Sequence, residues 1–331
     1  MHRRAYLRGS LAALSAATSA LAGCSESATT SEGTATTTPT APPATTRSVT
    51  HSATPAATPA ATPAPTDRSL APYRSWLVAP TPVTPHVYEF THLSLSAVRA
   101  DASEGFAASL DEYWRQRTTT YFGFEVPVAA IDVVLTVNHS RVANESYRVV
   151  GGSFDPAALR PALADAGFTA AGSVADLQRF IRTAEGQVRV VGLHPDVFVS
   201  IGADASATDP LATAIEQRAG GDVRTDEDAG LAALVEHFGT ADYVTGRELE
   251  PADEDYPLSE AVATGRRLDV EESTSRAERT YVLPPDATID RTAVEEEIRT
   301  RHVGQPIEAF RREGRFVTVA GEVENSLVRL L

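Results

Sequence analysis

The composition of residues 25–67 limits where this chain can fold. These residues are almost wholly Thr, Ala, Pro, Ser and Gly, and three tandem Ala-Thr-Pro-Ala units occupy residues 53–64. Such a stretch has too little apolar surface to offset the entropy lost on ordering it, and regularly spaced proline favours an extended chain. We therefore expect a disordered stalk, which either spaces the domain from its anchor or is a leader without a role. Folding is left to residues 68–331.

Residues 3–24 have the order of an export signal. Arg3 and Arg4 precede a weakly apolar segment that ends in Leu21-Ala22-Gly23-Cys24. An apolar stretch of about 7 to 15 residues between a basic start and small residues is typical of a cleaved signal peptide and is too short to span a bilayer. The twin arginines resemble a Tat export signal. We therefore interpret residues 1–23 as a Tat-type signal peptide.

Leu21 to Cys24 resemble a lipobox. The resemblance implies cleavage before Cys24 and attachment of lipid to it, and two acyl chains hold a protein stably at a membrane. Residues 24–67 would then form a lipidated stalk that anchors the protein to the outer face of the cytoplasmic membrane. Cys24 is the chain's only cysteine. This excludes an intramolecular disulfide, a cysteine zinc site and a thiol nucleophile in the domain.

All 29 basic residues other than histidine are arginine, so the chain contains no lysine. Residues 68–331 hold 25 of these arginines and 41 of the 44 acidic residues, an excess of 16 negative charges. Nucleic acids and anionic membrane surfaces would be repelled by a domain of this charge. We therefore expect neither as a partner.

The acidic, lysine-free composition together with the signal and the Thr-rich stalk resembles a family of haloarchaeal Tat-exported lipoproteins whose domain has no assigned function. The likeness covers residues 86–325 and rests on patterns such as Gly152-Ser153-Phe154-Asp155. It implies no catalytic residues. It does imply a dependence on salt, because molar salt screens the self-repulsion of a highly charged domain.

Hydrophobic patterning predicts an α+β domain of mostly antiparallel sheets with helices packed on one face. A similar order of hairpin, helix and hairpin in 131–203 and 264–322 suggests a weak internal duplication. A division into two subdomains would fall near 222–260. Strands are expected at about 86–92, 131–137, 147–154, 177–183, 188–194, 197–202, 241–247, 264–271, 277–283, 307–312 and 315–322, with helical sequence from the first strand to about 118.

Helix boundaries are predicted from capping residues. Asp155-Pro156 and Asp209-Pro210 each provide an N-cap and a first-turn proline, and Asp228 provides a third N-cap. A further helix is expected from Asp290. Glycines are expected to end the first three helices, at Gly167, at Gly220 with Gly221, and at Gly239.

Asn138-His139-Ser140 and Asn144-Glu145-Ser146 are N-glycosylation sequons. Both lie in the connection predicted between two strands, where an acceptor must be exposed. Asn138 and Asn144 are therefore candidate glycosylation sites of an exported protein.

Acidic residues gather in the loop 248–260. Oxygen ligands of this kind suit Ca²⁺, which takes six to eight of them, and the candidate ligands are Glu250, Asp253, Glu254 and Asp255. The spacing is not that of an EF-hand. The alternative is that the loop is the solvated surface expected of an acidic domain, and we predict no required cofactor.

No catalytic motif is found in residues 68–331. The sequence has no GxSxG elbow, no P-loop and no HExxH pair, although a triad assembled from distant residues stays open. We therefore expect a lipid-anchored, non-enzymatic binding or structural module of the cell envelope, with an envelope protein or polymer as its partner. The alternatives are a metal- or solute-binding lipoprotein that uses loop 248–260, and a hydrolase without a recognisable motif.

Overall fold

The computed structural model describes residues 72–325, with gaps at 80, 82–87, 140–145, 208, 250–257, 259, 286, 288–291, 293–294 and 297–307. All described residues belong to one compact unit, Pro63–Leu331. The signal peptide and the stalk lie outside the described residues, and of the helix predicted from Asp290 the structure describes residues 292 and 295–296, which are helical.

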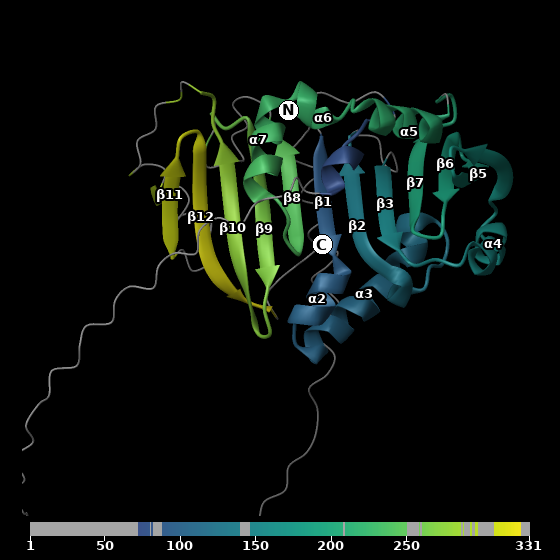
Figure 1. The fold of residues 1–331 in the computed structure, drawn as a ribbon, viewed down its shortest axis with the longest axis horizontal. Helices are drawn as coiled ribbons and strands as arrows, with labels where there is room; N and C mark the ends of the chain where they lie inside the picture. The colour runs from purple at the N-terminus through teal and green to yellow at the C-terminus, as the bar shows by residue number, and fades with distance from the viewer. Residues whose placement is uncertain are drawn as a thin grey trace, which may run out of the picture. The chain divides into compact units, whose positions relative to one another are not determined.

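The described strands form a twelve-stranded sheet in the order β11-β12-β10-β9-β8-β1-β2-β3-β7-β6-β5-β4, which can be followed across Figure 1. Every pairing is antiparallel. This confirms the predicted α+β class with an antiparallel sheet. The strands are β1 Glu89–Ser94, β2 Ile131–Asn138, β3 Ser146–Gly152, β4 Thr169–Val174, β5 Leu177–Ala184, β6 Gln187–Leu193, β7 Val197–Asp204, β8 Tyr243–Glu248, β9 Ala263–Val270, β10 Thr274–Val282, β11 Ala309–Glu313 and β12 Phe316–Glu324.

The strands on either side of residues 222–260 belong to this same sheet. In each predicted repeat, the second strand of the first hairpin pairs with the last strand of the later one: β3 with β7, and β10 with β12. The two regions differ in length, because the first also contains β4 and β5, whereas the second has β11 alone beside β12.

The helices start where the sequence places their caps. Asp155, Asp209 and Asp228 each accept a hydrogen bond from a backbone N–H of the first turn. The helical stretch predicted up to residue 118 is instead two helices, because Ser103 caps a new one. The helical elements are η1 Pro72–Trp76, α2 Leu95–Asp101, α3 Glu104–Phe122, η2 Val128–Ala130, α4 Pro156–Asp165, α5 Pro210–Gly220, α6 Arg224–Glu227 and α7 Ala229–Phe238.

Two large hydrophobic clusters lie on opposite faces of the sheet. The successive residues Phe198 and Val199 of β7 belong to different clusters, as expected for side chains that alternate along a strand. Helices α5 and α7 contribute to one cluster, and α2, α3 and α4 contribute to the other. The arrangement therefore differs from the one-sided helical layer that we predicted, because the central strands are apolar on both faces.

A third cluster packs on β10 and β12 around Tyr281 and Val317, and Leu249 and Leu258 belong to it. It lies on the same face of the sheet as the cluster to which α2, α3 and α4 contribute. Ala277 of β10 packs against that cluster, and Tyr281 is four residues further along the strand, so both side chains point to one face. The strand residues between the two clusters are polar. This uncovered strip of sheet contains the candidate site.

Two glycines bring α7 close to the sheet behind this strip. Gly246 of β8 and Gly265 of β9 are directly opposite each other. A Cβ atom on Gly265 would lie 2.3 Å from the Thr245 carbonyl oxygen and 2.8 Å from a methyl carbon of Leu234, and one on Gly246 would lie 2.2 Å from the Phe90 ring. Only glycine fits at this approach, so the helix fixes the two strands from behind.

Candidate functional site

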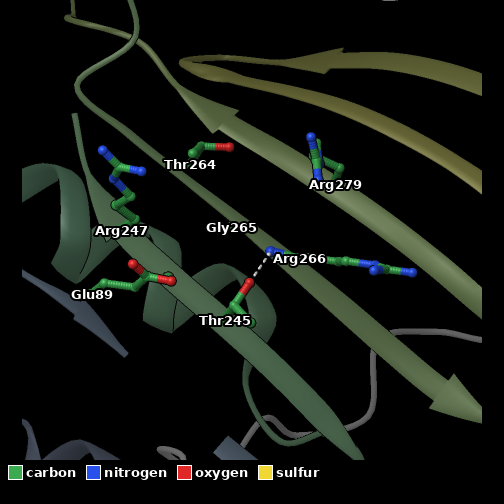
Figure 2. A pocket seen from close by; sticks show the side chains of 8 residues that line it. Glu89, Thr245, Arg247, Thr264, Gly265, Arg266 and Arg279 are labelled. Carbon is green, nitrogen blue, oxygen red and sulfur yellow. Dashed lines mark hydrogen bonds between the residues drawn. The ribbon is translucent and has the colours of Figure 1, made fainter. Parts of the chain in front are cut away.

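A pocket of about 220 Å³ opens on the uncovered strip of β1, β8, β9 and β10. Figure 2 shows the side chains of Arg247, Arg266 and Arg279 around it, which come from the neighbouring strands β8, β9 and β10. We call it the arginine pocket; its lining residues are Glu89, Thr245, Gly246, Arg247, Thr264, Gly265, Arg266 and Arg279.

Strand register places the polar side chains of the pocket next to one another. Arg266 lies directly opposite Arg279 on one side and Thr245 on the other. Directly opposite residues of antiparallel strands point to the same face. The Thr245 hydroxyl also accepts a hydrogen bond from the Arg266 backbone N–H at 3.2 Å, which holds the strands in this register. In the adjacent row Arg247 lies between Glu89 and Thr264.

The two opposed arginines have no carboxylate partner in the described part of the chain. Among the described residues, neither the Arg266 nor the Arg279 guanidinium makes an ion pair or a side-chain hydrogen bond. Burial lowers the pKa of Arg266; Tyr243 raises it by a smaller amount, and the like charge of Arg279 lowers it by a still smaller one. The absence is notable because acidic residues outnumber arginines in this domain.

Other arginines of the domain form ion pairs with carboxylates. Arginine and acid pair closely in Arg99–Asp111, Arg179–Asp209, Arg224–Glu248 and Arg267–Asp269. Arg267 is the sequence neighbour of Arg266, yet it points to the other face. Arg266 and Arg279, which have no ion pair with a described residue, are distinguished from these arginines by their position on the uncovered strip.

A second opposed arginine pair has a structural explanation. Arg182 and Arg189 face each other across β5 and β6, and Arg182 donates to the carbonyl oxygens of Ala166 at 2.9 Å and Gly123 at 3.3 Å. Arg189 donates to the Tyr121 carbonyl oxygen at 3.4 Å. These carbonyls end α3 and α4, where positive charge is favourable. Among the described residues, no such acceptors contact Arg266 and Arg279.

The arginine pocket is suited to binding an oxyanion. A guanidinium presents N–H donors in a planar fork that matches carboxylate, sulfate or phosphate oxygens. The lining includes no histidine, cysteine or serine, and Glu89 is its one acidic residue. The Thr264 hydroxyl already donates to the Thr280 carbonyl oxygen at 3.1 Å. These groups offer contacts to a ligand rather than a nucleophile with its base.

The structure describes some of the site residues predicted from the sequence and not others. Asn138 is exposed at the end of β2, directly opposite Glu89 of the pocket lining. Asn144 and the residues Cys24, Arg3 and Arg4 lie outside the described residues. The same is true of the candidate calcium ligands Glu250, Asp253, Glu254 and Asp255.

Glu248, at the start of the acidic loop, has a structural role. Its side chain is 3% exposed and accepts from the Arg224 guanidinium at 2.7 and 3.3 Å. Asp228 is engaged as the N-cap of α7. In the part of the chain that the structure describes, no three His, Cys, Asp or Glu side chains are grouped to hold a metal ion.

Two of the described histidines, His92 and His237, lie against aromatic rings. His237 lies 2.9 Å from a Glu278 carboxylate oxygen and stacks on Phe316. His92 stacks on the Tyr73 ring, and burial lowers its pKa to about 4. Each of the two rings faces an aromatic side chain.

Comparison with known proteins gives a fold relationship alone. No family model and no curated protein matches the chain. The fold is similar to crystal form III of TP0453, with a TM-score of 0.50 and 11% identity over 78% of this chain and 95% of that one. Crystal forms I and IV of TP0453 also match, with TM-scores of 0.44 and 0.45, identities of 12% and 11%, and coverage of 78% and 74% of this chain and 94% of each.

Among the helices whose residues are described, none is both long enough and apolar enough to cross a membrane.

Proposed function

We propose that this chain is an exported, lipid-anchored protein of the cell envelope that binds an anionic ligand in the arginine pocket without converting it. The predicted signal at residues 3–24 and the predicted stalk support export and lipid anchoring. The observation that carries the binding role is the opposed pair of Arg266 and Arg279, which has no carboxylate partner among the described residues.

The energetics favour a ligand at this position. Like charges directly opposite each other on neighbouring strands destabilise a sheet, by roughly 0.2 to 1 kcal/mol. Partial burial adds a desolvation cost for Arg266. A bound oxyanion would offset both, because charge-assisted hydrogen bonds are about twice as strong as neutral ones. The arrangement of the two arginines is therefore more favourable with an anion bound than without one.

The lining argues for binding in preference to catalysis. General acid–base or nucleophilic chemistry needs a titratable group within hydrogen-bond reach of a second one. The lining residues consist of arginine, threonine and glycine with a single glutamate. Such a set can hold and orient an anion.

Isothermal titration calorimetry of the full chain with sulfate and with galacturonate tests the proposal. The variants are Arg266→Gln and Arg279→Gln, and Arg276→Gln is the control, because Arg276 is exposed on β10 and points to the other face. We expect at least a tenfold loss of affinity in each pocket variant and none in the control. Equal affinity in wild type and both pocket variants, or no binding by wild type, would refute the proposal.

A further inference from the structure

We propose that the arginine pocket is one end of a longer site, which binds an extended acidic glycan lying across the strands. This inference rests on the proposed function, since it names the class of anion that the pocket takes. The defining juxtaposition is a row of polar side chains that continues from Arg279 and Arg266 over three further strands.

The row follows from the strand register. Arg279 faces Arg266, Arg266 faces Thr245, and Thr245 faces Thr91 of β1. Beyond β1, Thr91 faces Thr136 of β2, and Thr136 faces Arg148 of β3. All of these residues point to one face, because directly opposite residues of antiparallel strands do so.

The threonines of the row are available to a ligand. Thr91, Thr136 and Thr245 are each partly exposed. In the described part of the protein the hydroxyls of Thr91 and Thr136 make no hydrogen bond. By contrast, on the other face of the sheet the buried Thr280 and Thr318 hydroxyls lie 3.1 Å apart and hydrogen-bond to each other.

Arg148 closes the far end of the row. Its guanidinium donates to the Tyr121 carbonyl oxygen at 3.0 Å and to the Ser146 hydroxyl at 2.7 Å. It also lies over the Tyr121 ring, 5.1 Å from the ring centre. The open part of the row therefore runs from Thr136 to Arg279, across five adjacent strands.

The spacing of the row suits a sugar chain. Neighbouring strands lie about 4.8 Å apart, which is close to the ring-to-ring repeat of an extended pyranose chain. Threonine hydroxyls donate to and accept from sugar hydroxyls, and the arginines would hold a carboxylate or sulfate at one end. A nucleic acid is a poor match, because single-stranded binders stack bases on aromatic side chains and the residues of the row are threonine and arginine.

Titration with galacturonate and with its linear tetramer tests the inference. The protein is produced without glycosylation, so that no glycan on Asn138 occupies this face. We expect the tetramer to bind at least tenfold more tightly than the monomer. A tetramer that bound through only one sugar at a time would gain roughly fourfold in affinity, because it offers four equivalent units. The expected gain is larger than this.

The variants separate the row from the pocket. Thr91→Val and Thr136→Val remove hydroxyls but keep β-branched side chains, and together they should weaken tetramer binding at least fivefold while leaving monomer binding unchanged. Thr91→Ser with Thr136→Ser should retain tight tetramer binding, and Thr183→Val, at an exposed position on β5, is the control. A sulfated tetramer distinguishes sulfate from carboxylate as the preferred oxyanion.

Two failures are distinguishable. Equal affinity for monomer and tetramer, with both lost in Arg266→Gln, would overturn the glycan inference and leave the anion pocket in place. No measurable binding of either galacturonate or sulfate species by the wild type would overturn the proposed function itself.

Discussion

Replacing Arg279 with Gln is expected to stabilise the empty protein, whereas replacing Arg182 with Gln is expected to destabilise it. Both arginines face another arginine across two strands. Arg182 donates to two carbonyl oxygens and lies over the Phe168 ring, 4.8 Å from its centre. Arg279 has no such contacts among the described residues, so its removal relieves only repulsion.

The magnitudes follow from these contacts. Loss of a like-charge pair across strands is worth roughly 0.2 to 1 kcal/mol. At about 2 to 4 °C per kcal/mol for a domain of this size, Arg279→Gln should raise the melting temperature by roughly 0.4 to 4 °C. Loss of two hydrogen bonds at roughly 0.5 to 1.5 kcal/mol each should make Arg182→Gln lower it by roughly 2 to 12 °C.

Differential scanning calorimetry in a chloride buffer without oxyanions measures both changes. Low ionic strength is preferred, because salt screens the repulsion between partly exposed charges. Arg276→Gln, on the other face of β10, is expected to change the melting temperature little. A decrease for Arg279→Gln as large as that for Arg182→Gln would show that both pairs are structural and would refute the reasoning.

Three further outcomes are expected. Glu248→Gln should cost about 3 kcal/mol in urea unfolding, because it leaves the Arg224 guanidinium without its buried carboxylate; a loss below 1 kcal/mol would contradict this. Burial lowers the pKa of His92 to about 4. Between about pH 6.5 and pH 4, His92 is therefore protonated in the unfolded chain but not in the folded protein. The free energy of unfolding should fall by up to about 3 kcal/mol as pH drops through this range. His92→Gln should flatten that part of the stability–pH curve, and an unchanged slope would argue against it. The acid excess predicts a lower melting temperature in millimolar than in molar KCl, and identical curves would contradict this.

Much of the secondary structure could be predicted from local chemistry. The pairs Asp155-Pro156 and Asp209-Pro210 predicted two helix starts that the structure confirms, because a side-chain cap and a first-turn proline act within a few residues. The β-branched run from Ile131 predicted β2 in the same way. These features need no knowledge of the remaining chain.

Other features depend on contacts that the local sequence does not contain. The edge strand β4, Thr169–Val174, was not predicted, since its small, mostly exposed residues give no hydrophobic alternation. The placement of helices on both faces depends on which strands lie at the centre of the sheet. That order is set by pairings between residues far apart in the chain, such as Thr91 with Thr245.

The arginine pocket was missed for the same reason. Arg266 and Arg279 become neighbours only through the register of β9 and β10. One local signal was available: Thr264 and Arg266 alternate with Gly265 in a predicted strand, which indicates a polar face. The acidic loop 248–260 was predicted as a candidate site instead, because acidic clusters are visible without register.

The most direct test of the anion site is the effect of sulfate on the melting temperature of the full chain, compared with chloride at equal ionic strength. At 100 times its dissociation constant a ligand adds about 2.7 kcal/mol, or roughly 5 to 10 °C here. We predict such a rise for the wild type and for Arg276→Gln, and less than 1 °C for the double variant Arg266→Gln/Arg279→Gln. An equal rise in the wild type and the double variant would contradict the account.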